Sequence, residues 1–435
     1  MYFTSRSTRL QRLFSNPAWA LVAAFGTYFC MYGFRKPYTA ATYSGVSFLG
    51  LDYKTMLIIS QTIGYVLAKW IGIKIVSEIK PVKRIGAILG LIVFAEVMLL
   101  LFGVILKPWN AICLLLNGLP LGIIFGLVLS FVEGRKNTEF LIAGLCASFI
   151  VSDGVSKSVG AMLLGWGVTE QWMPVLAGLI FAGPTLLFIA MLACVPAPSI
   201  NDVASRSARE PMTGKDRVIF FKKYAPGILG IVFVYLLATL LRSVRADFAV
   251  EIWAGLGYKQ TPQLFTQSEL LVSLSVLAIV GFAAFIKNHE AAFDFSLYIS
   301  FIGLAILLLA FTGFNLGMEK FTLMILIGLG VYLPYVAVHA IIFERLIAIT
   351  RGKATVSFLM YIADSVGYTG YIALMLLRYI TPPTASLLAI FLKMCLYLGV
   401  LGIVLIIFTY WYFKYKLKNN EQTTTHIAGR QGYIV

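Results

Sequence analysis

The sequence predicts an all-α membrane protein in which twelve transmembrane helices form two pseudo-symmetric halves of six helices each. Three observations support this prediction: the composition, the number of long apolar runs, and an internal repeat. Of the 435 residues, 60% are hydrophobic and only 12% are charged, and the mean hydropathy is +0.87. This composition is typical of a chain whose solvent is lipid, so we expect a polytopic integral membrane protein.

The charge and the cysteines exclude several other classes of protein. The net charge of +16 comes from basic residues in short loops between apolar runs, which indicates orientation in a membrane rather than nucleic-acid binding. The cysteines lie inside apolar runs without CxxC or metal-ligand spacing, so we expect free thiols, no disulfide and no metal. They are Cys30, Cys113, Cys146, Cys194 and Cys395.

Twelve apolar runs are long enough to cross a bilayer, which takes about 20 mostly apolar residues. The first run follows Arg6, Arg9 and Arg12, but it is too long for a cleavable signal and lacks a small-residue cleavage pattern, so we expect it to remain as the first span. The runs cover residues 17–42, 54–77, 83–106, 110–132, 138–165, 172–195, 226–254, 265–287, 293–315, 320–345, 354–378 and 385–413.

The distribution of lysine and arginine predicts the orientation of these spans. Both terminal segments and the even-numbered connections carry most of the basic residues. Because cytoplasmic loops carry an excess of lysine and arginine, we expect both termini in the cytoplasm and the protein in the plasma (inner) membrane. The odd-numbered connections hold only Lys54, Lys107, Lys259, Lys320 and Arg378.

A polar stretch and an internal repeat divide the chain into two halves. Residues 197–225 have linker composition, so we expect a cytoplasmic linker between a half at 1–196 and a half at 226–417, with a disordered cytoplasmic tail at 418–435. Glu133 and Glu344 end the fourth and tenth spans, and Asp153 and Asp364 lie inside the fifth and eleventh. Both pairs are separated by 211 residues, as expected for two parallel six-helix repeats.

The first and seventh spans each place cations at membrane depth. Arg35 ends the first span, and Arg242 and Arg245 end the seventh. Such groups cost several kcal/mol in the bilayer and normally face a bundle interior or a wet cavity. Two arginines facing one central cavity form a clamp for a dianion. The alternative is that Arg245 pairs with Asp247 or Glu251, and Arg35 with some other internal acid.

These residues also carry a family resemblance. The patterns are Tyr28-x3-Tyr32-x2-Arg35-Lys36-Pro37, Gly64-Tyr65-Val66-Leu67-Ala68-Lys69, Leu241-Arg242 followed by Asp247, and Val338-His339-Ala340. Together they resemble the organophosphate:inorganic phosphate antiporters of the major facilitator superfamily, which include glycerol-3-phosphate and hexose-phosphate transporters and the glucose-6-phosphate exchangers. The resemblance implies that Arg35 and Arg242 bind phosphate and that Lys69 adds positive charge. We place Tyr32, Tyr65, Arg245 and His339 in the same substrate site.

The fifth span departs from the family pattern. Where the family has a histidine, this chain has Asp153, and Lys157 follows one helical turn later. An i,i+4 pair shares one helix face, so the two charges either neutralise each other or take part in coupling. We leave the same two roles, structural ion pair or coupling, open for Asp247 and Asp364.

No catalytic constellation competes with transport. Gly352-Lys353-Ala354 lacks the features of a phosphate-binding loop, and HExxH is absent, so we expect neither an enzyme nor a cofactor. The main hypothesis is a secondary transporter, a monomer in the bilayer, that moves a small organic anion, preferably phosphorylated, by alternating access and exchanges it for phosphate or couples it to protons. The alternatives are a proton-coupled symporter of another carboxylate or sugar-like solute, and a membrane receptor that binds an anion without moving it.

Overall fold

The predicted all-helical membrane architecture is confirmed. The computed structural model describes residues 13–48, 50–133, 135, 138–197, 214–259, 261–350, 356–380 and 386–431. Within these residues, ten helices are long enough and apolar enough to cross a membrane. A short antiparallel ribbon, β1 (Ser47–Phe48) and β2 (Leu51–Asp52), caps one end of the bundle. The protein is therefore an integral membrane protein.

Six helical units occupy the six predicted spans of the first half. The first unit is α2 with the 3₁₀ turns η1 and η2, and the second is α3; with the ten helices above they account for twelve spans. The elements are α2 (Pro17–Met31), η1 (Tyr32–Phe34), η2 (Pro37–Ala40), α3 (Tyr53–Glu78), η3 (Pro81–Lys83), α4 (Arg84–Val104), α5 (Ala111–Val132), α6 (Thr138–Gly165) and α7 (Met173–Ala193).

The second half repeats this plan. A short helix, α10, continues the seventh span, and a π-helical turn, η5, joins the two parts of the tenth. The elements are α9 (Gly214–Asp247), α10 (Ala249–Gly255), α11 (Pro262–Gly281), η4 (Phe282–Phe285), α12 (His289–Asn315), α13 (Lys320–Ala337), η5 (Val338–Ile342), α14 (Phe343–Thr350), α15 (Val356–Ile380) and α16 (Leu387–Gln431).

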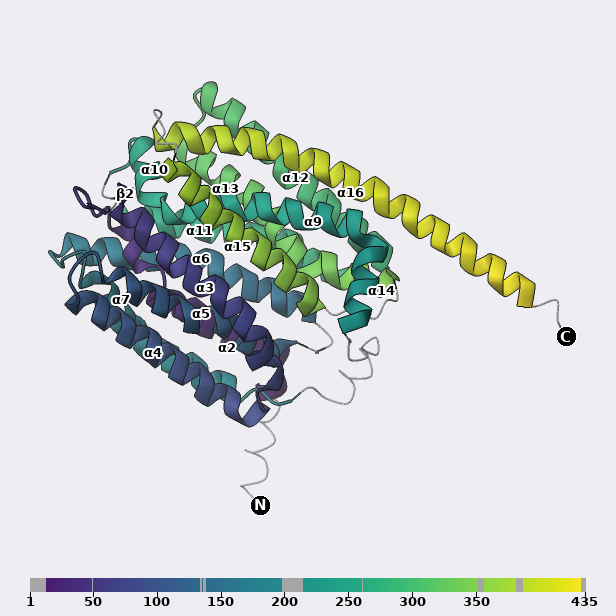
Figure 1. Ribbon diagram of the computed structural model, residues 1–435, viewed down its shortest axis with the longest axis horizontal. Helices are drawn as coiled ribbons and strands as arrows, with labels where there is room; N and C mark the ends of the chain where they lie inside the picture. Colours follow the sequence, from purple (N-terminus) through teal and green to yellow (C-terminus); the bar gives the residue numbers. More distant parts are fainter. Residues whose placement is uncertain are drawn as a thin grey trace, which may run out of the picture.

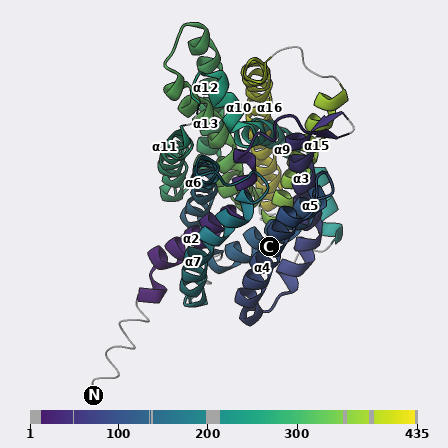
Figure 2. The ribbon, with the colours of Figure 1, turned by 90° about the vertical axis from the view of Figure 1, so that its left-hand side faces the viewer.

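The two halves lie side by side, with α2 to α7 on one side of the molecule and α9 to α16 on the other (Figure 1, Figure 2). Their interface is formed mainly by α6 against α11 and by α3 against α15. The repeat relates the second span, α3, to the eighth, α11, and the fifth span, α6, to the eleventh, α15. The pseudo-twofold axis therefore relates the α3–α15 contact to the α6–α11 contact. We call the end of the bundle where α2 begins the termini end, and the other end the far end.

Glycines bring α3 and α5 into close contact. A Cβ atom at Gly64 would lie 2.0 Å from the carbonyl oxygen of Leu115, and one at Gly118 would lie 2.3 Å from that of Gln61. Small residues allow membrane helices to approach this closely. The packing fixes the position of α3, the helix that carries Tyr65.

The first span is not a continuous helix. Helix α2 ends at Met31, and the chain continues through η1 and η2, where Pro37 at the first position of η2 has no N–H to continue an α-helical ladder. The exposed carbonyls are satisfied within the bundle: Asn117 Nδ2 donates to the Phe34 oxygen at 3.2 Å, and Gln61 Nε2 donates to the Arg35 oxygen at 2.9 Å. This break presents Arg35 to the interior of the bundle.

The linker and tail boundaries differ from the prediction. Residues 198–213 of the predicted linker lie outside the described residues. Residues 214–225 are helical and form the start of α9, which bends at Tyr224 (φ −120°, ψ 15°), two residues before Pro226. Helix α16 continues to Gln431, through most of the segment predicted to be disordered.

Cysteine labelling can test the predicted orientation. Lys107 lies between α4 and α5, and Lys259 between α10 and α11, whereas the exposed native Cys194 follows α7 at the termini end. In intact cells, cysteines introduced at Lys107 and Lys259 in a Cys194→Ser background are expected to react with an impermeant maleimide from outside. The native Cys194 is the matched control and should react only after lysis. Labelling of Cys194 in intact cells, with both introduced sites protected, contradicts this orientation.

Candidate functional site

A small cavity lies between the two halves at the centre of the bundle. Its volume is about 10 Å³, roughly what one water molecule requires. Helices of both halves contribute to its wall, and most of the wall is aromatic. The lining residues are Tyr28, Tyr32, Tyr65, Lys69, Phe125, Phe149, Arg242, Tyr335, His339, Asp364 and Tyr368. The predicted site residues Tyr32, Tyr65, Lys69, Arg242 and His339 are therefore brought together here.

Arg35 lies beside this cavity and is held by tyrosines. Its side chain is buried, and the guanidinium carbon lies 4.0 Å from the centroid of the Tyr65 ring. Nη1 donates to the hydroxyl of Tyr32 at 3.5 Å, and Nε has no hydrogen-bond partner in the described part of the chain. Cation–π contact and a neutral hydroxyl therefore replace the carboxylate that a buried arginine ordinarily has.

Arg242 has the same kind of surroundings on the other half. Nη2 donates to the hydroxyl of Tyr368 at 3.2 Å, and the guanidinium carbon lies 4.7 Å from the centroid of the Tyr335 ring. The rings of Tyr65 and Tyr368 meet edge to face, with centroids 4.9 Å apart. Arg35 and Arg242 thus flank one inter-half pair of tyrosines.

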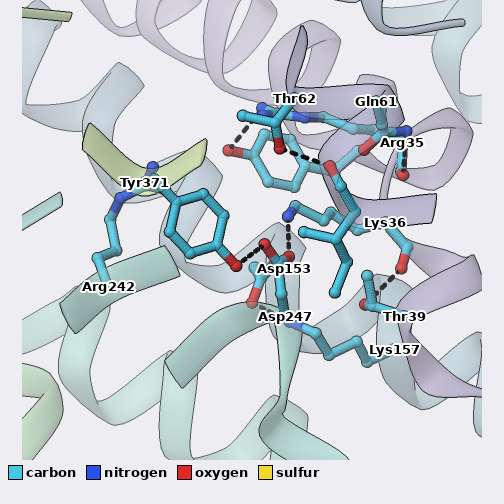
Figure 3. A network of polar contacts seen from close by, with 12 residues as sticks. Arg35, Lys36, Thr39, Gln61, Thr62, Asp153, Lys157, Arg242, Asp247 and Tyr371 are labelled. Atoms are coloured by element: carbon cyan, nitrogen blue, oxygen red, sulfur yellow. Dashed lines mark hydrogen bonds and ion pairs between the residues drawn. The ribbon is translucent and has the colours of Figure 1, made fainter. Parts of the chain in front are cut away.

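The other buried cations of the described chain are paired with carboxylates. Eight lysine and arginine side chains are buried there, and six of them form ion pairs. In Figure 3, no dashed line joins Arg35 or Arg242 to a carboxylate. An excess charge of +2 therefore resides on these two arginines. The six pairs are Lys36–Asp247, Lys54–Glu251, Lys69–Asp364, Lys157–Asp153, Arg245–Glu269 and Arg345–Glu139.

Lys69 and Asp364 join the two halves across the cavity. Lys69 Nζ lies 2.9 Å from Asp364 Oδ2, and Asp364 Oδ1 accepts a 2.5 Å hydrogen bond from the hydroxyl of Tyr235. The Lys69 ammonium also lies 5.0 Å from the centroid of the Tyr65 ring. The predicted cation at Lys69 is therefore neutralised in this conformation, and it can reach an anion only by leaving Asp364.

Lys36 and Asp247 form a second pair between the halves, with Tyr371 donating to Asp247 Oδ2 at 2.8 Å (Figure 3). The sequence alone did not identify Lys36 as the partner of Asp247. The repeat contains the signal, since these residues are also separated by 211 positions. Repeat-equivalent positions face each other across the pseudo-twofold axis, which explains how the two side chains meet.

Ion pairs also join the halves near both ends of the bundle. At the far end, Lys54 Nζ lies 2.5 Å from Glu251 Oε1. At the termini end, the Arg345 guanidinium binds both carboxylate oxygens of Glu139, each at 2.7 Å. Opening either end therefore requires the separation of a charged pair.

The fifth-span pair is formed, and Arg245 lies apart from the predicted site residues that line the cavity. Lys157 binds Asp153 one turn away on α6, although Asp153 Oδ1 keeps no hydrogen-bond partner among the described residues. Arg245 does not line the cavity. It binds Glu269 of α11 within its own half and donates to the carbonyl of Met324 at 3.2 Å, rather than pairing with Asp247 or Glu251.

The fold is shared with solved structures of membrane transporters. They include a mutant of the nucleoside transporter NupG, with 15% identity, a TM-score of 0.56, and coverage of 92% of this chain and 100% of that one. A bacterial homolog of the human lysosomal transporter Spinster, inward-facing and unoccupied, has 12% identity, a TM-score of 0.55, and coverage of 92% and 97%. A D-xylose–proton symporter has 13% identity, a TM-score of 0.56, and coverage of 92% and 98%.

Comparisons at the level of sequence identify the family without a function. No curated protein matches the sequence. One family model, described as "Family of unknown function (DUF5690)", matches residues 37–416. This range contains the second to the twelfth span, but it begins at η2 and leaves out α2, η1 and Arg35. The chain therefore belongs to the DUF5690 family.

Proposed function

We propose that the protein is a secondary transporter for a small organic anion, preferably a phosphorylated one, and that the anion binds between Arg35 and Arg242. The observation that carries this proposal is the pairing of the buried cations. Every buried lysine of the described chain has a carboxylate partner, as do the two other buried arginines. Leaving two guanidinium groups buried without carboxylates is costly, and a bound anion removes that cost.

The charge and geometry suit a phosphate monoester. Its phosphate carries close to two negative charges at neutral pH and offers three acceptor oxygens. Each guanidinium is a planar fork of N–H donors that matches such oxygens in pairs. Arg35 and Arg242 come from opposite halves, so one phosphate held by both also draws the two halves together.

Alternating access follows from how the halves are joined. The cavity is too small for an organic phosphate in this conformation, so the substrate enters when one end of the interface opens. Opening the far end separates Lys54 from Glu251, and opening the termini end separates Arg345 from Glu139. A central site with a charged closure on each side is the arrangement that rocking of two repeats requires.

Counterflow in reconstituted vesicles tests the proposal. Purified protein is placed in vesicles loaded with unlabelled phosphate or a phosphate monoester, and labelled phosphate is added outside. We expect the label to accumulate transiently without an imposed proton gradient. Accumulation only with a proton gradient supports the symporter instead. Saturable binding of labelled phosphate without flux supports the receptor, and neither binding nor flux contradicts the two-arginine site.

A further inference from the structure

We infer that His339 and Asp364 form a second pole of the same cavity, which binds a hydroxyl group on the organic part of the substrate. This inference rests on the proposed function, because it assumes that the anionic end of the substrate lies at Arg35 and Arg242. It adds the requirement that the transported ester carry a hydroxyl group, which His339 of η5 and Asp364 of α15 bind.

A π-helical turn places His339 on the cavity wall. The turn η5 interrupts the tenth span between α13 and α14, and such turns occur frequently at functional sites. The imidazole is enclosed by aromatic rings, with centroids 4.7 Å from Tyr335, 5.3 Å from Tyr235 and 6.2 Å from Phe125. These contacts fix the plane of the imidazole, so its nitrogens have little freedom to find other partners.

Nε2 of His339 has no hydrogen bond in the described part of the chain. Nδ1 is buried and faces the Tyr335 carbonyl, one turn earlier. Nε2 lies 3.9 Å from Asp364 Oδ1, which is too far for a hydrogen bond. A buried polar group left unsatisfied is unfavourable, so a partner from the substrate is expected to be stabilising.

Asp364 is the fixed half of this pole. Lys69 and the Tyr235 hydroxyl hold its two carboxylate oxygens, and a carboxylate oxygen can accept more than one hydrogen bond. A hydroxyl oxygen to one side of the line that joins Asp364 Oδ1 and His339 Nε2 can lie about 2.8 Å from both atoms, because these are 3.9 Å apart. It donates to Asp364 and completes a hydrogen bond with His339.

A hydroxyl fits this pole better than an ammonium group does. Lys69 already neutralises Asp364, and Arg242 lines the same cavity, so a further cation would meet two positive charges. The charge of the surroundings and the Nε2 atom without a hydrogen bond therefore both favour a neutral group that donates and accepts.

A matched set of small phosphate esters tests this assignment. In the counterflow assay, unlabelled 2-hydroxyethyl, ethyl and 2-aminoethyl phosphate compete with labelled inorganic phosphate. The corresponding three-carbon esters place the terminal group farther from the phosphate. At the chain length that fits better, we expect the hydroxyl ester to compete about tenfold more strongly than the alkyl ester of the same length. One added hydrogen bond to a buried polar group has about this effect. The aminoalkyl ester should be weaker than the hydroxyl ester.

Variants separate hydroxyl recognition from a structural role. His339→Phe keeps an aromatic ring in the cluster and should bring the ratio of hydroxyl to alkyl affinity close to one. His339→Gln keeps a donor and an acceptor and should recover part of the preference. His289→Phe, the same substitution beside Arg345 at the termini end and away from the cavity, is the matched control and should retain the ratio even if transport slows.

The possible results distinguish this inference from the proposed function. Equal competition by hydroxyl and alkyl esters, or an unchanged ratio in His339→Phe, overturns the hydroxyl pole while leaving the anion site intact. A preference for the aminoalkyl ester also overturns it, because the pole then accepts a cation. Failure of inorganic phosphate and of every ester to compete or exchange overturns the proposed function itself.

Discussion

Replacement of Arg35 or Arg242 by lysine is expected to weaken phosphate binding by about 10- to 100-fold, the effect of losing a charge-assisted hydrogen bond. Lysine keeps the positive charge but cannot form the two-pronged contact of a guanidinium. Each variant should still fold. Neither arginine has a carboxylate partner among the described residues, so neither substitution leaves a buried acid without its cation. Isothermal titration with inorganic phosphate in detergent measures the change.

The double variant and a control complete this experiment. Because Arg35 and Arg242 are expected to bind one ligand, the double lysine variant should lose less affinity than the two single losses together predict. Arg84→Lys is the matched control, since Arg84 is only half-buried and donates to the carbonyl of Ser130 away from the cavity. Undiminished phosphate binding in both single variants would show that the anion is held elsewhere.

Replacement of Arg245 by methionine is expected to destabilise the fold rather than alter substrate affinity selectively. The substitution leaves Glu269 buried on α11 without its cation, and stranding one member of a buried pair typically costs about 3–5 kcal/mol. Thermal unfolding of the detergent-purified protein should show a clearly lower midpoint. Arg245→Met combined with Glu269→Leu should recover most of the loss, because no charge is then left unpaired.

A normal unfolding midpoint in the Arg245→Met variant, together with a large loss of phosphate affinity, would indicate that Arg245 binds the substrate. The double variant serves as the reference, since a structural pair predicts recovery of stability, whereas a binding role predicts that affinity stays low. The structure favours the structural pair because Arg245 does not line the cavity.

Much of the fold could be predicted from the sequence because membrane helices are determined locally. Each span is a run of apolar residues long enough to cross the bilayer, and every backbone group must be satisfied within it. The repeat then paired the spans through equivalent charged positions. The break after Met31 was missed because most of residues 17–42 are apolar, as in a single membrane helix. Pro37 was the one signal in the sequence against a continuous helix.

Charge partners were harder to predict because they depend on tertiary contacts. The sequence offered Asp247 and Glu251 as partners for Arg245 because they are close along the chain, but Lys36 and Lys54 of the other half take both acids. The pair on α6 was predictable since a four-residue spacing on one helix is itself a local feature. Tyr32 and Tyr65 beside Arg35 were placed in the site because they belong to the patterns of the family resemblance. Tyr335 and Tyr368 beside Arg242 were not identified, because the chain contains so many aromatic residues.

The excess charge of the central site affects how the protein responds to membrane voltage. In the proposed transporter, Arg35 and Arg242 give the unloaded carrier two positive charges, which a bound dianion would cancel. Moving one elementary charge through the full potential takes about 2.3 kcal/mol per 100 mV. The loaded carrier can therefore reorient without electrical work at the site, whereas the unloaded carrier cannot. One-for-one exchange of dianions is then electroneutral, and voltage acts only on the empty return step.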